Sequence, residues 1–223
     1  MEKTSTTRSQ APMMEGATAR WYSRQRGSAP QLAIVQHHAA LLTAGLPRGA
    51  AVLEVAPGPG YLAVEMARLG FAVTGLDISH TFVEIATEHA CRAGVHVQIE
   101  LGDAADLPFD ADSFDLVVCQ AAFKNFGRPV RALDEMHRVL RGGGTAVIHD
   151  MNRGASRADI GQEVERMGLS PLNSILTRVP LTMLKRRAYS RAQFERLAAE
   201  TAFRTCAVRA DGITLEVRLT KPA

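Results

Sequence analysis

The sequence has few cysteines, few aromatic residues and no long apolar run. Its three cysteines, Cys91, Cys119 and Cys206, form no Cys-x-x-Cys pair, so we expect reduced thiols and no metal site. Aromatic residues make up only 5% of the chain, so the stacking platforms that bind nucleic acids are scarce. No window approaches the ~20 apolar residues needed to cross a bilayer, so we expect no integral membrane association.

Charge and composition indicate an ordinary globular protein. The net charge is +3 over 223 residues, without the clustered basic residues of a nucleic-acid-binding surface. Hydrophobic residues form 46% and charged residues 22% of the chain, as is typical of globular domains. Residues 1–12 are polar and lack the apolar segment of a secretory signal. We therefore expect a disordered tail at 1–12 and a single domain at 13–223 of a cytoplasmic monomer or homodimer.

Apolar runs and helical spacings alternate from residue 30 to residue 149. The short apolar runs predict strands, and the spacings between them predict helices. Strands that are apolar throughout and separated by helices indicate a parallel sheet covered on both faces. The expected strands are 51–56, 71–76, 96–101, 114–121 and 144–149, and the expected helices are 30–44, 61–69, 79–93 and 129–140.

The pattern changes after residue 150. Residues 151–189 contain one helical stretch, at 158–167, and we expect this long connection to act as a lid. A helix at 190–200 follows, with Ser190 as its cap. Apolar residues at 203–209 and 213–219 then predict two antiparallel strands, joined at Asp211-Gly212. Together these elements predict a doubly wound α/β domain with a mostly parallel, seven-stranded sheet and an antiparallel C-terminal hairpin.

A glycine-rich loop follows the first predicted strand. Gly58-Pro59-Gly60 opens the next helix, where backbone N–H groups can approach a ligand closely. Asp77 follows 17 residues after Gly60, at the end of the second strand, where a carboxylate can accept hydrogen bonds from ribose hydroxyls. This pair fits NAD, FAD or another nucleoside, and a glycine turn without a ligand is the alternative.

Four blocks of sequence together are more specific. They are VLEVAPGPG at 52–60, GLD at 75–77, GDAADLPF at 102–109 followed by FDLVV at 114–118, and RVLRGGG at 138–144. In this order they resemble the class I S-adenosylmethionine-dependent methyltransferases, in particular the ubiquinone/menaquinone-biosynthesis-like small-molecule group. The resemblance covers about residues 32–148 and implies a Rossmann-like fold. Ala56 stands where the family usually has glycine, and Pro57 and Pro59 flank Gly58.

The resemblance implies a site for S-adenosyl-L-methionine, with S-adenosyl-L-homocysteine as product. At the methionyl end, Glu54 would hold the ammonium group and Tyr22, in a lid at 13–29, would touch the carboxylate. Ala56, Gly58 and Gly60 would shape the loop. The remaining roles are Asp77 on the ribose, Ile78 on the adenine face, Asp103 and the backbone of Ala104 on the adenine edge, and Gln120 beside the sulfonium.

Acceptor-side residues are expected at strand ends and in the lid. Phe123 and Phe126 would wall the pocket, and Lys124 would bind an acidic substrate or reach solvent. Leu176 and Met183 would meet an apolar acceptor. His149 ends the fifth strand, where it could act as a base or simply orient the loop.

These expectations lead to methyl transfer onto a small hydrophobic or aromatic metabolite, with an O, N or C acceptor atom left open. A non-methylating enzyme on the same scaffold, such as a cyclase, is an alternative that the sequence does not separate. An NAD(P)-dependent oxidoreductase is disfavoured, because none of the tyrosines at 22, 61 and 189 has lysine four residues later.

Overall fold

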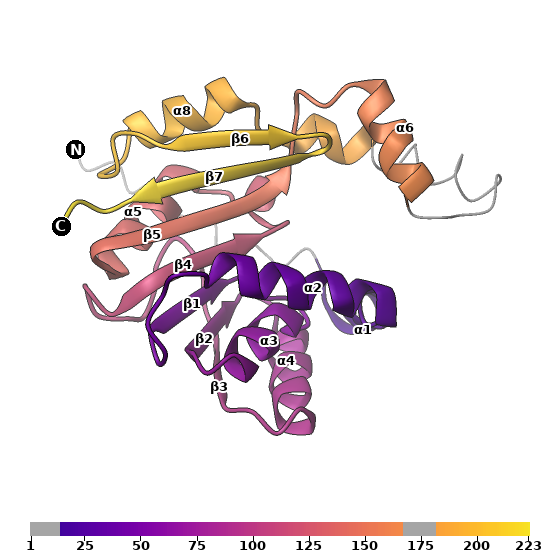
Figure 1. The fold of residues 1–223 in the computed structure, drawn as a ribbon, viewed down its shortest axis with the longest axis vertical. Helices are drawn as coiled ribbons and strands as arrows, with labels where there is room; N and C mark the ends of the chain where they lie inside the picture. The colour runs from indigo at the N-terminus through magenta and orange to yellow at the C-terminus, as the bar shows by residue number, and fades with distance from the viewer. Residues whose placement is uncertain (1–13, 167–181) are drawn as a thin grey trace, which may run out of the picture.

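The computed structural model describes residues 14–166 and 182–223, and within them seven strands form one sheet in the order β3-β2-β1-β4-β5-β7-β6 (Figure 1). Strands β1 to β5 run parallel, and β7 runs antiparallel to β5 and β6, so the predicted fold class is confirmed. The strands are β1 Ala51–Val55, β2 Ala72–Asp77, β3 Val97–Leu101, β4 Phe114–Gln120, β5 Leu140–Met151, β6 Ala207–Asp211 and β7 Thr214–Thr220.

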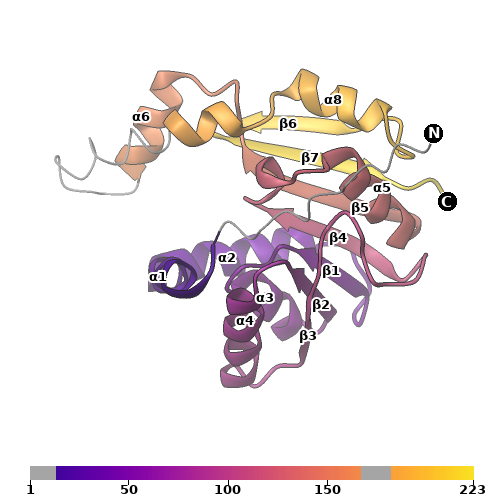
Figure 2. The same cartoon turned by 180° about the vertical axis from the view of Figure 1, so that it is seen from behind.

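Helices cover both faces of this sheet. Alternating side chains divide the core, because Val52 and Leu116 pack on one side while Leu53 and Val117 pack on the other. Helices α2, α3 and α4 cover the first side, and α5 and α8 cover the second, which Figure 2 shows from behind. The bounds are α1 Gly16–Arg26, α2 Ala29–Leu42, α3 Tyr61–Arg68, α4 His80–Arg92, the 3₁₀ turn η1 Phe123–Asn125, α5 Pro129–Val139, α6 Arg157–Arg166 and α8 Arg191–Ala199.

Most predicted elements agree with the structure to within two residues, and β5 and β6 differ by more. Helix α1 and the turn η1 were not predicted. Strand β6 begins at Ala207 rather than at residue 203, because Phe203 is buried in the core and Arg204 has a φ of +65°. Strand β5 begins at Leu140, where it pairs with Phe114, and continues through the glycines at 142–144. In the part of the chain that the structure describes, no helix is long and apolar enough to span a membrane.

The strand order determines where a ligand-binding crevice is expected. From β1 the chain moves outward to β2 and β3, and then returns to β4 on the other side of β1. Ligands of open α/β sheets bind at such a reversal, outside the carboxyl ends of the strands. The ends of β1, β2 and β4 are therefore the expected place for a site.

Candidate active site

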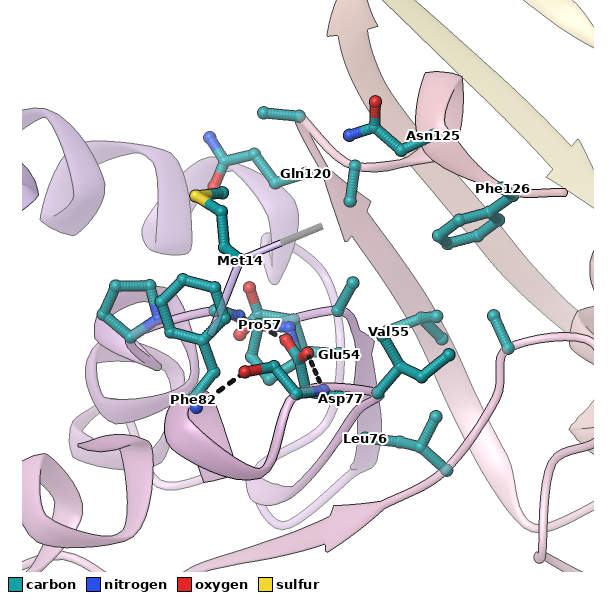
Figure 3. Close-up of a pocket in the computed structure, with 18 of the residues that line it drawn as sticks. Met14, Glu54, Val55, Pro57, Leu76, Asp77, Phe82, Gln120, Asn125 and Phe126 are labelled. Carbon is teal, nitrogen blue, oxygen red and sulfur yellow. Dashed lines mark hydrogen bonds between the residues drawn. The ribbon is translucent and has the colours of Figure 1, made fainter. Parts of the chain in front are cut away.

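A pocket of about 250 Å³ lies at the carboxyl ends of β1, β2 and β4 (Figure 3). Three loops that follow these strands line it, together with residues of α1 and the η1 region. Nine of the ten residues predicted to bind the donor line the pocket: Tyr22, Glu54, Ala56, Gly58, Asp77, Ile78, Asp103, Ala104 and Gln120. The tenth, Gly60, caps α3 beside them. The structure thus brings these residues together, and their individual roles stay predictions.

The loop after β1 has a tightly constrained backbone. Ala56, Gly58 and Gly60 have φ values of +57°, +54° and +77°, in the left-handed region. A Cβ atom on Gly60 would lie 2.7 Å from the Cβ of Ala86 in α4, so only glycine fits there. The loop is also held by the backbone N–H of Ala56, which donates to the carbonyl of Leu76 at 2.8 Å. The alanine that departs from the family pattern therefore adopts the turn.

Glu54 lies at the base of the pocket with an unsatisfied oxygen. Its side chain is buried, and Oε2 has no hydrogen-bond partner among the described residues. Burial raises the pKa of Glu54 to about 8; the backbone N–H of Ala63 opposes the rise, and the charge of Asp77 adds to it. A buried carboxyl group that faces a pocket and lacks a partner fits a cationic ligand group such as an ammonium.

Asp77 presents a second buried carboxylate beside the loop. Its Oδ1 accepts from the backbone N–H of Ser79, and its Oδ2 accepts from that of Gly58, both at 2.9 Å. Burial raises the pKa of Asp77, although these two bonds oppose the rise. Each carboxylate oxygen has a second lone pair, so Asp77 can still accept from two neighbouring hydroxyl groups.

Asp103 lies at the nucleoside end and is held by two partners. Its Oδ1 accepts from the backbone N–H of Ala105, and its Oδ2 pairs with the guanidinium of Arg128, both at 2.9 Å. Ile78 and Ala104 provide apolar surface in the same part of the pocket. The acidic and apolar groups here suit a purine ring with its amino group.

On the acceptor side, Phe126 lines the pocket but Phe123 does not. Phe123 is fully buried and packs against Phe194 and Tyr189, with ring centroids 5.0 and 5.7 Å away. The prediction that Phe123 walls the pocket is therefore wrong. It supports the η1 turn from the core, which the apolar sequence around it could not distinguish from a pocket wall.

Lys124 forms a buried ion pair. Its Nζ lies 2.8 Å from Oδ1 of Asp150, and the two side chains are 7% and 3% exposed. The backbone N–H of Lys124 donates to the other oxygen of Asp150, and its Nζ also donates to the carbonyl of Ala121. The alternative that Lys124 reaches solvent is contradicted, since its side chain is buried and paired with Asp150; binding of an acidic substrate stays a prediction.

His149 and Met183 do not line the pocket. The Nε2 of His149 lies 2.7 Å from Oε2 of Glu216, and its ring stacks on that of His38. This arrangement favours the structural alternative for His149 over a direct role as base. Met183 is 61% exposed and stands apart from the pocket lining. Leu176 lies outside the described residues, as do the whole tail at 1–12 and residues 167–181 of the segment at 151–189.

Helix α1 lies within the segment at 13–29, which was expected to be a lid, and forms one wall of the pocket. Glu15, at its start, accepts hydrogen bonds from the backbone N–H groups of His80 and Thr81 at the beginning of α4. Tyr22 packs edge-on against Phe82, with ring centroids 6.0 Å apart. Other pocket residues that the sequence analysis missed are Met14, Arg26, Tyr61, Phe82, Asn125 and Arg128. They come from segments without a motif, so no pattern in the sequence identifies them.

Part of the sequence is similar to that of known proteins. Residues 53–148 match the family described as a methyltransferase domain. A ubiquinone biosynthesis O-methyltransferase from Xanthomonas axonopodis pv. citri (strain 306) is 34% identical over 108 residues, 48% of this chain and 45% of that protein. A demethylmenaquinone methyltransferase from Clavibacter sepedonicus is 36% identical over 100 residues, 45% of this chain and 40% of that protein. The matched regions thus span less than half the length of these relatives.

Solved structures agree with the fold over most of the chain. A methyltransferase from Aquifex aeolicus, described as SAM-dependent, superposes with a TM-score of 0.67 at 16% identity, covering 89% of this chain and 96% of that one. A protein from Methanococcus maripaludis, described as an S-adenosyl-L-methionine-dependent methyltransferase, gives 0.70 at 20% identity, with coverages of 92% and 93%. The domain match over residues 53–148 and these superpositions agree on the fold, which this chain shares with the two methyltransferase structures.

Proposed function

We propose that this chain transfers the methyl group of S-adenosylmethionine to a small acceptor with an apolar or aromatic body. The observation that carries the donor assignment is the unpartnered Oε2 of buried Glu54, in the same pocket as Asp77. A cation and two vicinal hydroxyl groups are the complement of these carboxylates. The relatives named for ubiquinone and demethylmenaquinone support an acceptor that bears a ring.

The residues present fit the donor and indicate what each would do. Glu54 would hold the ammonium, Asp77 the ribose hydroxyls and Asp103 the adenine amino group. When bound, S-adenosylmethionine supplies a sulfonium methyl group, whose carbon–sulfur bond breaks as the acceptor's lone pair forms the new bond, leaving S-adenosylhomocysteine. The protein would contribute chiefly alignment of the acceptor with the methyl group. An acceptor that carries a proton on the reacting atom must also lose it to a base.

Calorimetric titration with S-adenosylhomocysteine tests the donor assignment, with NADH and NADPH as controls. We expect binding of the sulfur nucleoside alone. Asp77→Ala should weaken this binding by about 1–3 kcal/mol, because the ribose hydroxyls lose their acceptor. Asp110→Ala, which removes an exposed carboxylate outside the pocket, should leave the affinity unchanged. Binding of a nicotinamide nucleotide instead would overturn the proposal.

The transfer itself needs a separate readout. The protein is incubated with S-adenosylmethionine labelled in its methyl group and a panel of small phenols, amines and quinols. Label in an acceptor together with released S-adenosylhomocysteine would support methyl transfer. Conversion of an acceptor without loss of the methyl group would instead favour a non-methylating enzyme on the same scaffold.

A further inference from the structure

Three polar side chains stand in one row across the sheet, on neighbouring strands. Gln120 of β4 is paired in register with His149 of β5, and His149 is paired with Glu216 of β7. Side chains alternate along a strand, and Val118, two residues before Gln120, packs in the core cluster shared with α2. These three residues, here called the polar row, therefore face α2 at the carboxyl end of β4.

His38 of α2 contacts two members of the polar row. Its ring stacks on that of His149, with centroids 4.3 Å apart and planes within 8°. Its Nδ1 lies 3.1 Å from Nε2 of Gln120. The Nε2 of His149 in turn lies 2.7 Å from Oε2 of Glu216. A chain of contacts thus runs from Glu216 through two stacked imidazoles to Gln120, which lines the pocket.

The partners in this chain fix where the protons lie. A carboxylate only accepts, so Nε2 of His149 carries a proton and donates it to Glu216. An amide nitrogen only donates, so Nδ1 of His38 is unprotonated and accepts from Gln120. Burial lowers the pKa of His38 to about 4; repulsion from His149 and His37 adds to this, and Glu216 opposes it. At neutral pH His38 is therefore an uncharged acceptor.

This contact determines which end of the Gln120 amide is available to a ligand. With Nε2 directed to His38, the carbonyl oxygen Oε1 is turned away from α2, on the side of the pocket. Figure 3 shows Gln120 and Asn125 across the pocket from Asp77, and thus away from the groups expected to hold the donor's ribose. Met14 and Phe126 add apolar surface to the pocket. A carbonyl oxygen among apolar side chains recognises a molecule that donates a hydrogen bond.

We propose that His38 is a positioning residue that holds the carbonyl of Gln120 toward the pocket, and that the acceptor carries an O–H or N–H donor on an apolar ring. The inference rests on the proposed function and specifies its substrate class. It also changes the expected role of Gln120, from contact with the sulfonium region to recognition of the acceptor.

The protonation of His38 is measured directly by NMR of imidazole nitrogens in the S-adenosylhomocysteine complex. We expect Nδ1 of His38 to have the resonance of an unprotonated nitrogen at pH 7, with the proton on Nε2. A proton on Nδ1 would overturn the proposal, because Gln120 would then present its nitrogen to the pocket. This readout requires no acceptor.

Acceptor preference is measured with a matched pair of probes, 2-naphthol and 2-methoxynaphthalene, on the same complex by fluorescence. The two share a ring system, and only the first can donate a hydrogen bond. We expect 2-naphthol to bind about fivefold to tenfold more tightly, the value of one hydrogen bond. Equal affinities, or no binding of either probe, would overturn the substrate class.

Variants test whether the preference for 2-naphthol depends on the contact between His38 and Gln120. Gln120→Leu and His38→Leu should both abolish the preference for 2-naphthol, whereas His38→Asn, whose side chain can still accept from the amide, should retain it. A His38→Leu protein that keeps the preference would contradict the positioning role. The affinity for S-adenosylhomocysteine should be the same in the two His38 variants, which lie outside the pocket lining, and this shows that they fold. Failure of the wild-type protein to bind that ligand would instead defeat the proposed function itself.

Discussion

Glu54 is buried in the core, and burial raises the pKa of its carboxyl group. An ordinary buried glutamate is paired, but one oxygen of Glu54 has no partner among the described residues. The native protein keeps this group although it is destabilising when ionised. Such a buried, perturbed group beside a pocket is typical of a binding site.

Binding of S-adenosylhomocysteine should therefore release protons at pH 7. With its pKa near 8, Glu54 is mostly protonated in the free protein, and an ammonium beside it favours the carboxylate. The affinity should accordingly rise between pH 6 and pH 8. Calorimetry in phosphate and Tris, whose ionisation enthalpies differ, measures the proton count. Glu54→Gln should bind more weakly, without the proton release.

The same pKa also sets the sign of a stability effect. The folded pKa of Glu54 lies above its ordinary value of 4.5, so the native state binds more protons than the unfolded state between these values. Glu54 therefore lowers the free energy of unfolding as pH rises from about 5 to 8. Thermal unfolding of Glu54→Gln should show a gain over wild type that grows across this range. A gain that shrinks with pH would contradict the burial argument.

Ala56 tests whether the loop stores strain. Its φ of +57° costs an L-residue about 1 kcal/mol or more, a cost that glycine does not have. Ala56→Gly should leave the free energy of unfolding unchanged or raise it by up to about 1 kcal/mol, because the entropy of glycine offsets part of the gain. Ala33→Gly, at an exposed position within α2, should instead lose about 1 kcal/mol. Chemical denaturation measures both, and equal losses would show that Ala56 is unstrained.

At the scale of elements, the sequence was most informative where burial alone decides the structure. The strands β1, β2 and β4 are buried on both faces, so their continuous apolar runs identified them. Helix α1 is polar and depends on contacts with α4 and Tyr61, which a local pattern does not contain. Phe203 was mistaken for a strand residue because its burial comes from packing between helices and sheet rather than from pairing.

The junction between α1 and α2 should tolerate no side chain at Gly27. A Cβ there would lie 2.4 Å from the hydroxyl of Tyr61, which donates to the carbonyl of Ser23 at 3.0 Å. Gly27→Ala should therefore displace α1 and speed amide exchange at residues 16–26, while β1 and β4 stay protected. Adding Tyr61→Phe removes the clashing oxygen and should restore part of the protection. Unchanged exchange in Gly27→Ala would show that α1 is not seated on Tyr61.

At the scale of the whole molecule, the order of the strands brings together residues that are far apart in the sequence. Most residues expected to bind the donor could be predicted to line one pocket because they stand at strand ends, and parallel strands end at one edge; Tyr22, in α1, is the exception. The polar row could not be predicted, since the register between β5 and β7 and the position of α2 over them follow from tertiary packing. Lys124 was misjudged for the same reason, because Asp150 reaches it only through the pairing of β4 with β5.

The pocket joins α1, three strand-end loops and the η1 region, so a ligand in it should stabilise the whole fold. A ligand that binds only the native state adds RT ln(1 + [L]/Kd), or about 2.7 kcal/mol at one hundred times Kd. For a chain of 223 residues this corresponds to a rise in Tm of about 5–11 °C with S-adenosylhomocysteine. Asp77→Ala should lose about a third to nine tenths of the rise, and Asp110→Ala none of it. If the ligand slows amide exchange only in α1 and leaves Tm unchanged, it orders α1 and does not stabilise the whole domain.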